Sequence, residues 1–330
     1  MFHPDGKHLL GGGRDGIRRW RLADGQEVGK QMGMELWAIA ASRDHKWVVC
    51  GTDKGASVWD AELHEKLIEV KGTETVSAVD VSPDSARFAA GTEGDCEASI
   101  WSMSSGKRLV GPLKHDKWVT GIVFSPDGEH VTTACYGGSV RIFGSHNGDE
   151  VITIATISPS TWPNIPLVWS NDVHQIFATS DDDKVRSFAV STGSQIAESP
   201  ILSNGHRSVA LAPNGTFIAT YARRSISFLD TSTLSLVVPV IDDSKDIFSI
   251  AISPDGNYLA TGQDDGRLIV RNLSTILPDS YRPVHVAICP YWHIAPLTCN
   301  VRHLLLRENN QTSCFRPRPA MTTNHLVLTR

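Results

Sequence analysis

Two groups of residues have the types and spacing that chemistry requires, and each points to a different kind of site. Residues 11–16 read GGGRDG, the G-x-G-x-x-G spacing of a turn that binds a dinucleotide. Further along, Cys289 with His293 and Cys299 with His303 form two Cys-x3-His pairs, which offer thiolate and imidazole ligands for zinc. Each motif works only in a particular structural context, so the elements around it decide whether it is a site.

A phrase of about ten residues recurs along the chain and reveals its organisation. It reads FHPDGKHLL at 2–10, FSPDGEHVTT at 124–133 and ISPDGNYLAT at 252–261. Seven copies, two of them degraded, are anchored at Pro4, Arg43, Pro83, Pro126, Asn171, Pro213 and Pro254. A repeat of roughly 40–45 residues is typical of four-stranded propeller blades.

Each unit supports this interpretation locally. A β-branched run such as VTGIVFS at 119–125 leads into a Pro-Asp-Gly turn, and a second run such as NYLATG at 257–262 follows such a turn. A turn that contains Asp then leads to a third run, as in DKGASVWD at 53–60. Closely spaced turn signals without helical periodicity predict an all-β chain.

The Pro-Asp-Gly phrases, the VWD at 58–60 and the IWS at 100–102 resemble the WD-repeat family of β-propellers. The resemblance covers about residues 1–275 and implies that residues 1–279 form a seven-bladed β-propeller of four-stranded antiparallel blades. The chain begins inside what would be the innermost strand of the first blade. We therefore expect an incomplete first blade and a coding sequence that is truncated at its N-terminus.

Residues 280–330 differ in composition from the rest of the chain. They hold six Arg against one acidic residue, Glu308, although the formal net charge of the whole chain is −5. The repeat register is lost there, but VHVAICPYWHIA at 284–295 echoes a repeat and NHLVLT at 324–329 has the pattern of a strand. We interpret this segment as an irregular C-terminal extension, either a decayed repeat or a strand that closes the ring, and otherwise poorly ordered.

The sequence context argues against both the dinucleotide site and the zinc site that the two motifs suggest. In the aligned units, residues 11–16 fall on a strand end and a turn before another strand, whereas a dinucleotide fingerprint needs a helix there. The Cys-x3-His pairs have apolar or proline-rich flanks, so we expect incidental placement rather than zinc. The tail arginines lack an aromatic platform for nucleic acid. We expect no catalytic residue, no cofactor and no metal, and hence no enzyme.

The family resemblance also assigns a structural role to one residue in most units. In WD repeats an Asp in the turn between the second and third strands joins a hydrogen-bond network with a His, a Ser or Thr and the Trp. Alignment places this Asp at Asp15, Asp53, Asp95, Asp182 and Asp265. The His remains only at His115 and His206, in units that lack the Asp, so we expect the Asp residues to have solvent or turn-local partners.

The resemblance implies a binding surface at the rim where the innermost strands begin. Five residues fall on this rim by alignment: Trp37, Trp118, Thr120, Arg207 and Phe248. Trp and Arg are frequent among the residues that dominate interface energies. We therefore predict a non-enzymatic scaffold that presents its blade-connecting loops to protein partners, and not to nucleic acid or a membrane.

Two alternatives stay open. The chain could be the C-terminal sensor propeller of a larger signalling NTPase whose upstream part is absent here, or a metal-dependent propeller hydrolase.

The start of the chain lacks a signal-peptide pattern, and no apolar run approaches the roughly 18 residues of a membrane span. The six cysteines are scattered, which favours a cytoplasmic or nuclear location.

Overall fold

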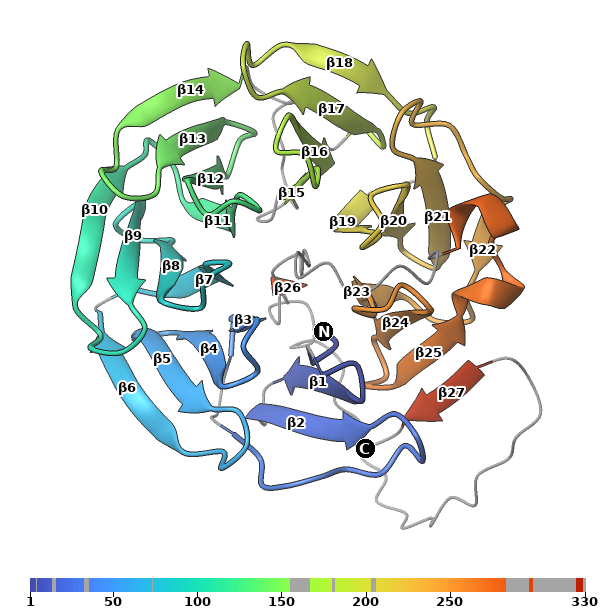
Figure 1. Ribbon diagram of the computed structural model, residues 1–330, viewed down its shortest axis with the longest axis horizontal. Coiled ribbons are helices and arrows are strands. Elements are labelled where there is room, and N and C mark those ends of the chain that lie inside the picture. The colour runs from blue at the N-terminus through green and yellow to red at the C-terminus, as the bar shows by residue number, and fades with distance from the viewer. Residues whose placement is uncertain are drawn as a thin grey trace.

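The computed structural model is a ring of radial β-sheets around a central axis (Figure 1). It describes residues 1–3, 5–13, 16–32, 36–72, 74–154, 167–179, 182–202, 206–282, 297–298 and 325–328. Within these ranges the helices are two short 3-10 turns, η1 (Leu273–Thr275) and η2 (Asp279–Tyr281). No helix in the described ranges has the length and apolar character needed to cross a membrane.

Six blades make up most of the ring, and each runs from an innermost to an outermost strand. Blade 1 contains β3 (Ala38–Ala41), β4 (Trp47–Thr52), β5 (Gly55–Asp60) and β6 (Lys66–Lys71). Blade 2 contains β7 (Val76–Val81), β8 (Arg87–Thr92), β9 (Glu97–Ser102) and β10 (Arg108–Lys114). Blade 3 contains β11 (Val119–Phe124), β12 (His130–Cys135), β13 (Val140–Gly144) and β14 (Glu150–Ile154).

The other three blades follow the same order. Blade 4 contains β15 (Leu167–Trp169), β16 (Gln175–Thr179), β17 (Val185–Ala189) and β18 (Gln195–Glu198). Blade 5 contains β19 (His206–Leu211), β20 (Phe217–Ala222), β21 (Ser225–Asp230) and β22 (Ile241–Asp242). Blade 6 contains β23 (Ile247–Ile252), β24 (Tyr258–Gln263), β25 (Leu268–Asn272) and β27 (His325–Leu328).

The hydrophobic core lies between neighbouring blades rather than within one of them. One cluster joins Ile100 and Val110 of blade 2 to Ile122 and Phe143 of blade 3. All six residues of β11 are buried, whereas the residues of the outermost strand β6 are exposed or half-buried. Inner strands are covered on both faces by adjacent sheets, which explains their nearly continuous apolar sequences.

The prediction of seven four-stranded blades is wrong in number, because the described residues form six blades and a smaller N-terminal sheet. This sheet contains β1 (His8–Gly13) and β2 (Gly16–Arg21), and Figure 1 shows it between blade 1 and blade 6. The flanking segments make only isolated bridges, which join Phe2 to Leu9, Ile17 to Met32 and Trp20 to Glu27. Residues 1–3, which precede the first turn, make one bridge, whereas the corresponding innermost strand of blade 2, β7, has six residues.

Two strands from the end of the chain join blades at positions outside the chain order. β27 pairs with β25 as the outermost strand of blade 6, with Val327 opposite Ile269. β26 (Leu297–Thr298) pairs with β3 on the inner side of blade 1, which makes that sheet five-stranded. The sheets on both sides of the N-terminal sheet therefore each receive a late strand.

The G-x-G-x-x-G stretch lies in a β-hairpin. Gly12 pairs with Ile17 and Gly13 with Gly16, so the stretch joins two strands and not a strand to a helix. A Cβ atom on Gly11 would lie 2.7 Å from the ring of Trp20 on the partner strand. Gly11 therefore allows Trp20 to pack over β1, which is a structural reason for this glycine.

Candidate functional site

The ring has two faces with different residues. Because each blade repeats the same antiparallel order, the innermost strands all begin on one face, which we name the entry face. The Pro-Asp-Gly turns that end these strands lie on the opposite face, which we name the turn face. The residues predicted to bind a partner belong to the entry face.

Trp118 is the most exposed aromatic residue of the predicted set that the structure describes. It directly precedes β11, and its side chain is 40% exposed. Its ring centroid lies 5.9 Å from that of Tyr136, and its backbone oxygen accepts a hydrogen bond of 2.8 Å from the Tyr136 nitrogen. The backbone contact fixes the two loops, so the entry face presents a preformed aromatic pair.

Trp37 and Asp53, which the sequence assigned to different roles, are in contact. Trp37 precedes β3 and is half-buried, and its indole Nε1 donates a hydrogen bond to Asp53 Oδ1. The backbone nitrogen of Trp37 also donates to Gly51, at 2.9 Å. The turn aspartate of blade 1 therefore orients a tryptophan of the entry face.

The other three predicted rim residues differ in accessibility. Phe248 in β23 is half-buried, and its backbone oxygen accepts a hydrogen bond from the Tyr221 hydroxyl at 2.5 Å. Thr120 is only 1% exposed, and its Oγ1 donates to Ala134 at 3.3 Å. The backbone of Arg207 belongs to β19, and its side chain lies outside the described part of the structure. Thr120 thus supports the strand rather than the surface.

The remaining turn aspartates have varied surroundings. Asp182 forms an ion pair with Arg186 of β17. Asp265 accepts a hydrogen bond of 3.1 Å from the Arg267 nitrogen and pairs with its Nε at 2.9 Å. Asp95 is exposed, and Asp15 lies outside the described residues. Asp182 therefore pairs with the strand that follows its turn and Asp265 with a residue of its own turn, whereas Asp53 contacts a tryptophan of the entry face.

His115 is a remnant of the repeat network in a unit that lacks the aspartate. Its ring is buried and meets the ring of Phe143 edge-on, at a centroid distance of 5.6 Å. Among the described residues neither ring nitrogen has a hydrogen-bond partner. Burial, with the nearby Arg141, lowers the pKa of His115 to about 4. His115 is therefore neutral near pH 7 and acts as packing.

Asp80 adds a carboxylate to an innermost strand, but it serves the joint between two blades. Its Oδ2 accepts a hydrogen bond of 2.7 Å from the Phe124 nitrogen of blade 3. Burial raises the pKa of Asp80 to about 7, against the opposing effects of hydrogen bonds from the backbone of Phe124 and Val81 and the charge of Arg43. The hydrogen bond from Phe124 therefore gives the Asp80 carboxyl group a structural role between blades 2 and 3.

The turn face is lined by aspartates that close their own turns. In blade 2, Ser82 Oγ donates to Asp84 Oδ1 at 2.5 Å and accepts from the Arg87 nitrogen at 2.9 Å. Three adjacent turns border a cavity of about 480 Å³. Its lining residues are Pro83, Asp84, Pro126, Asp127, Asn171, Asp172 and Val173.

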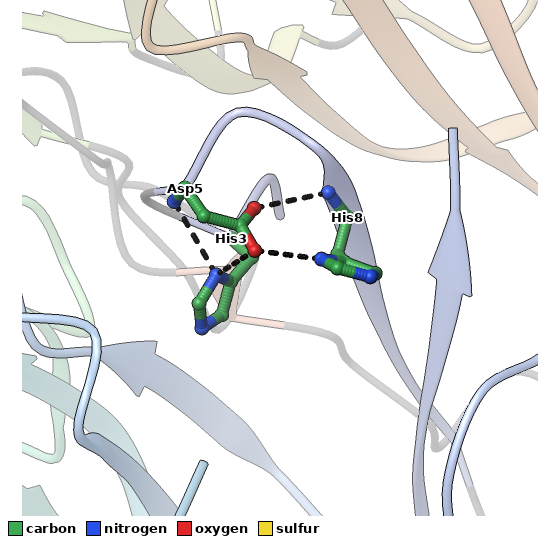
Figure 2. A group of neighbouring side chains, drawn as sticks. All are labelled: His3, Asp5 and His8. Carbon is green, nitrogen blue, oxygen red and sulfur yellow. Dashed lines mark hydrogen bonds and ion pairs between the residues drawn. The ribbon is translucent and has the colours of Figure 1, made fainter. Parts of the chain in front are cut away.

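The turn of the N-terminal sheet carries a group that the sequence analysis missed. His3, Asp5 and His8 bring three potential metal-ligand atoms within 4.8 Å of one another, and the described residues contain no other such group (Figure 2). The sequence signal was available in FHPDGKH. A histidine takes the place that serine holds in five of the other turns, and a second histidine follows five residues later. The Cys-x3-His pairs lie outside the described residues.

The radial arrangement of four-stranded antiparallel sheets defines a β-propeller. The β-propeller domain of Cps50 (Swd1) from Myceliophteria thermophila has the same fold, with a TM-score of 0.70 and 16% identity. That alignment covers 82% of this chain and 95% of the other.

The sequence carries the repeats of a known family. The family model described as WD domain, G-beta repeat matches residues 29–60, 65–102, 107–144 and 237–272, so the chain contains WD repeats. It is 22% identical over 273 residues to the intraflagellar transport protein 122 homolog of Xenopus tropicalis. It is 30% identical over 159 residues to the small ribosomal subunit protein RACK1 of Caenorhabditis elegans.

Both relatives match only in part. The first alignment covers 81% of this chain and 22% of the relative, so the chain spans about a fifth of that protein's length. The second covers 46% of this chain and 48% of the relative. The alignments identify the type of repeat, and the blade-connecting loops of this chain must be considered by themselves.

Proposed function

We propose that this protein is a non-enzymatic scaffold that binds protein partners through its entry face. The observation that carries the proposal is the half-exposed pair of Trp118 and Tyr136, which a backbone hydrogen bond fixes in position. The presence of WD repeats supports the proposal, since WD-repeat propellers generally bind protein partners. A rigid aromatic pair contributes contact area at a low cost in conformational entropy.

The proposed surface extends from this pair along the entry face. Trp37 is half-buried and oriented by Asp53, and Phe248 is half-buried at the start of β23. These side chains lie on separate blades, so a partner must contact several loops to use them. The surface therefore favours a folded protein or a long peptide over a small molecule. Arg207 remains part of the proposed surface because its backbone lies near the start of the innermost strand β19.

We also propose a reducing compartment, the cytoplasm or the nucleus, as the place where the scaffold acts. Cys50, Cys96 and Cys135 are free thiols in the described chain, and Cys50 and Cys135 are buried. Burial raises the pKa of the Cys135 thiol to about 11, so this thiol is protonated and unreactive. Free buried thiols are typical of proteins that mature under reducing conditions.

Quantitative affinity capture with matched variants tests the proposed surface. Trp118→Ala removes the exposed ring from the entry face. Tyr258→Ala is the control, because Tyr258 is 39% exposed but begins β24 directly after a Pro-Asp-Gly turn, on the turn face. Partners that bind the entry face are depleted by Trp118→Ala and retained by Tyr258→Ala.

The outcomes separate the surface from general effects on folding. Both variants are first compared with the wild type by thermal unfolding, and only variants that fold are used. Trp37→Ala and Arg207→Ala extend the test to other blades. Partners that survive all three entry-face substitutions but are lost with Tyr258→Ala would show that the turn face is the binding surface.

A further inference from the structure

The turns of five of the six four-stranded blades are closed by a hydroxyl group, whereas blade 5 has Ala212 at this position. In blade 3, Ser125 Oγ donates to Asp127 Oδ1 at 2.5 Å and accepts from the His130 nitrogen at 2.9 Å. The same pair of contacts is formed by Ser42, Ser82, Ser170 and Ser253. One small side chain thus satisfies both the aspartate and the first strand residue after the turn.

The turn of the N-terminal sheet is built differently. Asp5 Oδ1 accepts hydrogen bonds from the Lys7 and His8 nitrogens, at 2.8 and 3.1 Å, and so takes over the role of the hydroxyl. Asp5 Oδ2 instead faces two imidazoles. It lies 3.1 Å from His3 Nδ1 and 2.6 Å from His8 Nδ1, as Figure 2 shows.

The hydrogen bonds of His3 leave a chemical conflict at this point. The Asp5 backbone nitrogen donates to His3 Nδ1 at 3.3 Å, so this ring nitrogen presents its lone pair. The same nitrogen lies 3.1 Å from the Asp5 carboxylate oxygen, which is also an acceptor. Two acceptors at this distance repel each other unless a cation lies between them. The side chain of His3 is 6% exposed, so bulk water screens the contact poorly.

We propose that His3 Nδ1, Asp5 Oδ2 and His8 Nδ1 bind a divalent transition-metal ion, for which Zn²⁺ is the reference. Two imidazoles and one carboxylate form a ligand set that Zn²⁺ and its first-row neighbours prefer. Ligand bonds of about 2.0–2.2 Å place such atoms roughly 3–4 Å apart. The three atoms lie within 4.8 Å of one another. The separation of 3.1 Å between His3 Nδ1 and Asp5 Oδ2 already fits, whereas Asp5 Oδ2 and His8 Nδ1, at 2.6 Å, must move slightly apart.

The ion has a structural consequence for the sheet that holds it. His3 belongs to the short N-terminal segment and His8 begins β1. These two elements are joined by a bridge between Phe2 and Leu9 and by backbone hydrogen bonds, such as that from the His3 nitrogen to the His8 oxygen at 2.9 Å. Metal ligation adds a side-chain link to these backbone contacts. Asp5 and His8 are 27% and 20% exposed at their side chains, which leaves the ion accessible from solvent and a fourth position free for water.

Calorimetric titration of Zn²⁺ into the metal-free 330-residue chain tests the site. The wild type binds Zn²⁺ with a stoichiometry that includes this site, and its unfolding temperature rises with bound metal. His3→Ser restores the hydroxyl of the other turns, and His8→Gln introduces the residue type that Gln175 supplies in blade 4. Each substitution removes one of three ligands and is expected to weaken binding at this site at least about 100-fold.

The control variant is His130→Gln. His130 holds the same place after its turn as His8 does, but Ser125 closes that turn, so Zn²⁺ binding stays unchanged. Thermal unfolding in a chelator shows that His3→Ser and His8→Gln still fold. Unchanged Zn²⁺ affinity in both variants overturns the proposal, as does a wild type that binds no Zn²⁺, since His3 Nδ1 then carries a hydrogen and donates to Asp5.

Cobalt substitution identifies the ligands directly. A Co²⁺ ion held by two imidazoles and a carboxylate gives weak visible bands without thiolate charge transfer. These bands are expected in the wild type and in His130→Gln, and they are lost in His3→Ser. An intense thiolate-to-cobalt band in their place would assign the metal to the Cys-x3-His pairs and overturn the proposal.

Discussion

Asp80 makes the stability of the ring depend on pH. Its folded pKa of about 7 lies above the ordinary value of 3.8, so the folded state holds its proton where the unfolded chain has lost it. The stabilisation is complete below pH 3.8 and is lost as the pH rises to about 7. Asp80→Asn stays neutral and keeps an oxygen for the Phe124 nitrogen. We expect this variant to exceed the wild type by about 4 kcal/mol at pH 8 and to match it within about 1 kcal/mol at pH 4.

Urea unfolding at both pH values measures this difference. A gap of the same size at pH 4 and pH 8 would contradict the raised pKa, because it would show that the variant acts through packing rather than through ionisation. Asp84→Asn is a control on the same blade, since the pKa of Asp84 is lowered by its bond to Ser82 and by neighbouring groups that together outweigh burial.

His115 has the opposite dependence on pH. Its folded pKa of about 4 lies below the ordinary value of 6.5, so its contribution is present above pH 6.5 and is lost as the pH falls to about 4. His115→Leu removes two buried nitrogens that lack partners in the described chain and removes this titration. We expect the variant to be about 1 kcal/mol more stable than the wild type at pH 7.5. The advantage should grow by about 2 kcal/mol at pH 5, and chemical denaturation at both values measures it.

The sequence predicts single residues well where they repeat and poorly where they depart from the repeat. The serines and aspartates of the Pro-Asp-Gly turns could be placed because each unit repeats the same local hydrogen bonds. His3 and His8 lie in the same kind of turn but make different contacts. Alignment with the other units therefore predicted their positions in the repeat but not what they contact. The bond between Trp37 and Asp53 joins two loops whose approach is set by the blade, and the sequence holds no local sign of it.

At the scale of elements, a single arginine joins blade 2 to blade 3. Arg87 at the start of β8 donates to Ser145 O and Oγ, at 3.1 and 3.0 Å, and to Gly128 O at 3.2 Å. Its guanidinium also lies 5.7 Å from the ring centroid of Phe124. Arg87→Met keeps the apolar stem but removes the donor of all three contacts, and only the hydrogen bond from Ser145 Oγ to Gly128 O remains among these oxygens. We expect a loss of roughly 2–3 kcal/mol in the free energy of unfolding.

The matched control for this prediction is Arg108→Met. Arg108 is exposed and lies over the ring of Trp101 within its own blade, at 5.8 Å. Its loss should cost at most about 1 kcal/mol. Urea unfolding of both variants tests the prediction, and equal losses would show that Arg87 contributes no more than a surface cation does.

The strands of the complete blades follow from the sequence, whereas the joints of the ring do not. The run VTGIVFS predicted an innermost strand, and β11 covers Val119–Phe124. Each such strand needs only its own alternation and a turn. Residues 1–3 make an isolated bridge to β1 and no ladder, and the identity of the strand beside β25 depends on a segment far away in sequence.

On the scale of the whole molecule, most contacts between blades are local in sequence, and the exceptions lie where the N-terminal sheet and the late strands β26 and β27 join blades 1 and 6. Blades 1 to 5 take four successive strands each, and their core clusters link neighbours such as blades 2 and 3. Blade 6 takes β27 from residues 325–328, more than fifty residues after β25 ends at Asn272. The outer edge of this blade therefore depends on a strand that is distant in sequence.

Removing β27 should expose that edge and weaken the ring. Without it, β25 presents a row of unpaired N–H and C=O groups, which can pair with another chain. A chain shortened to end at residue 323 is expected to unfold at least about 3 °C lower than the wild type, since a loss of roughly 1–2 kcal/mol shifts a large domain by a few degrees. It should also self-associate as its concentration rises, which analytical ultracentrifugation measures.

A proline variant separates strand pairing from simple loss of chain. The double substitution Leu326→Pro and Val327→Pro removes two backbone N–H donors from the centre of β27, where these residues lie opposite Val270 and Ile269. Because both donors are removed, the one that faces β25 is lost in either case. Thr329→Pro lies beyond the end of the strand and serves as the control. The double variant should match the shortened chain in unfolding temperature and self-association, and the control should match the wild type. A shortened chain that remains monomeric and equally stable would show that β27 is not needed to cover the edge of blade 6.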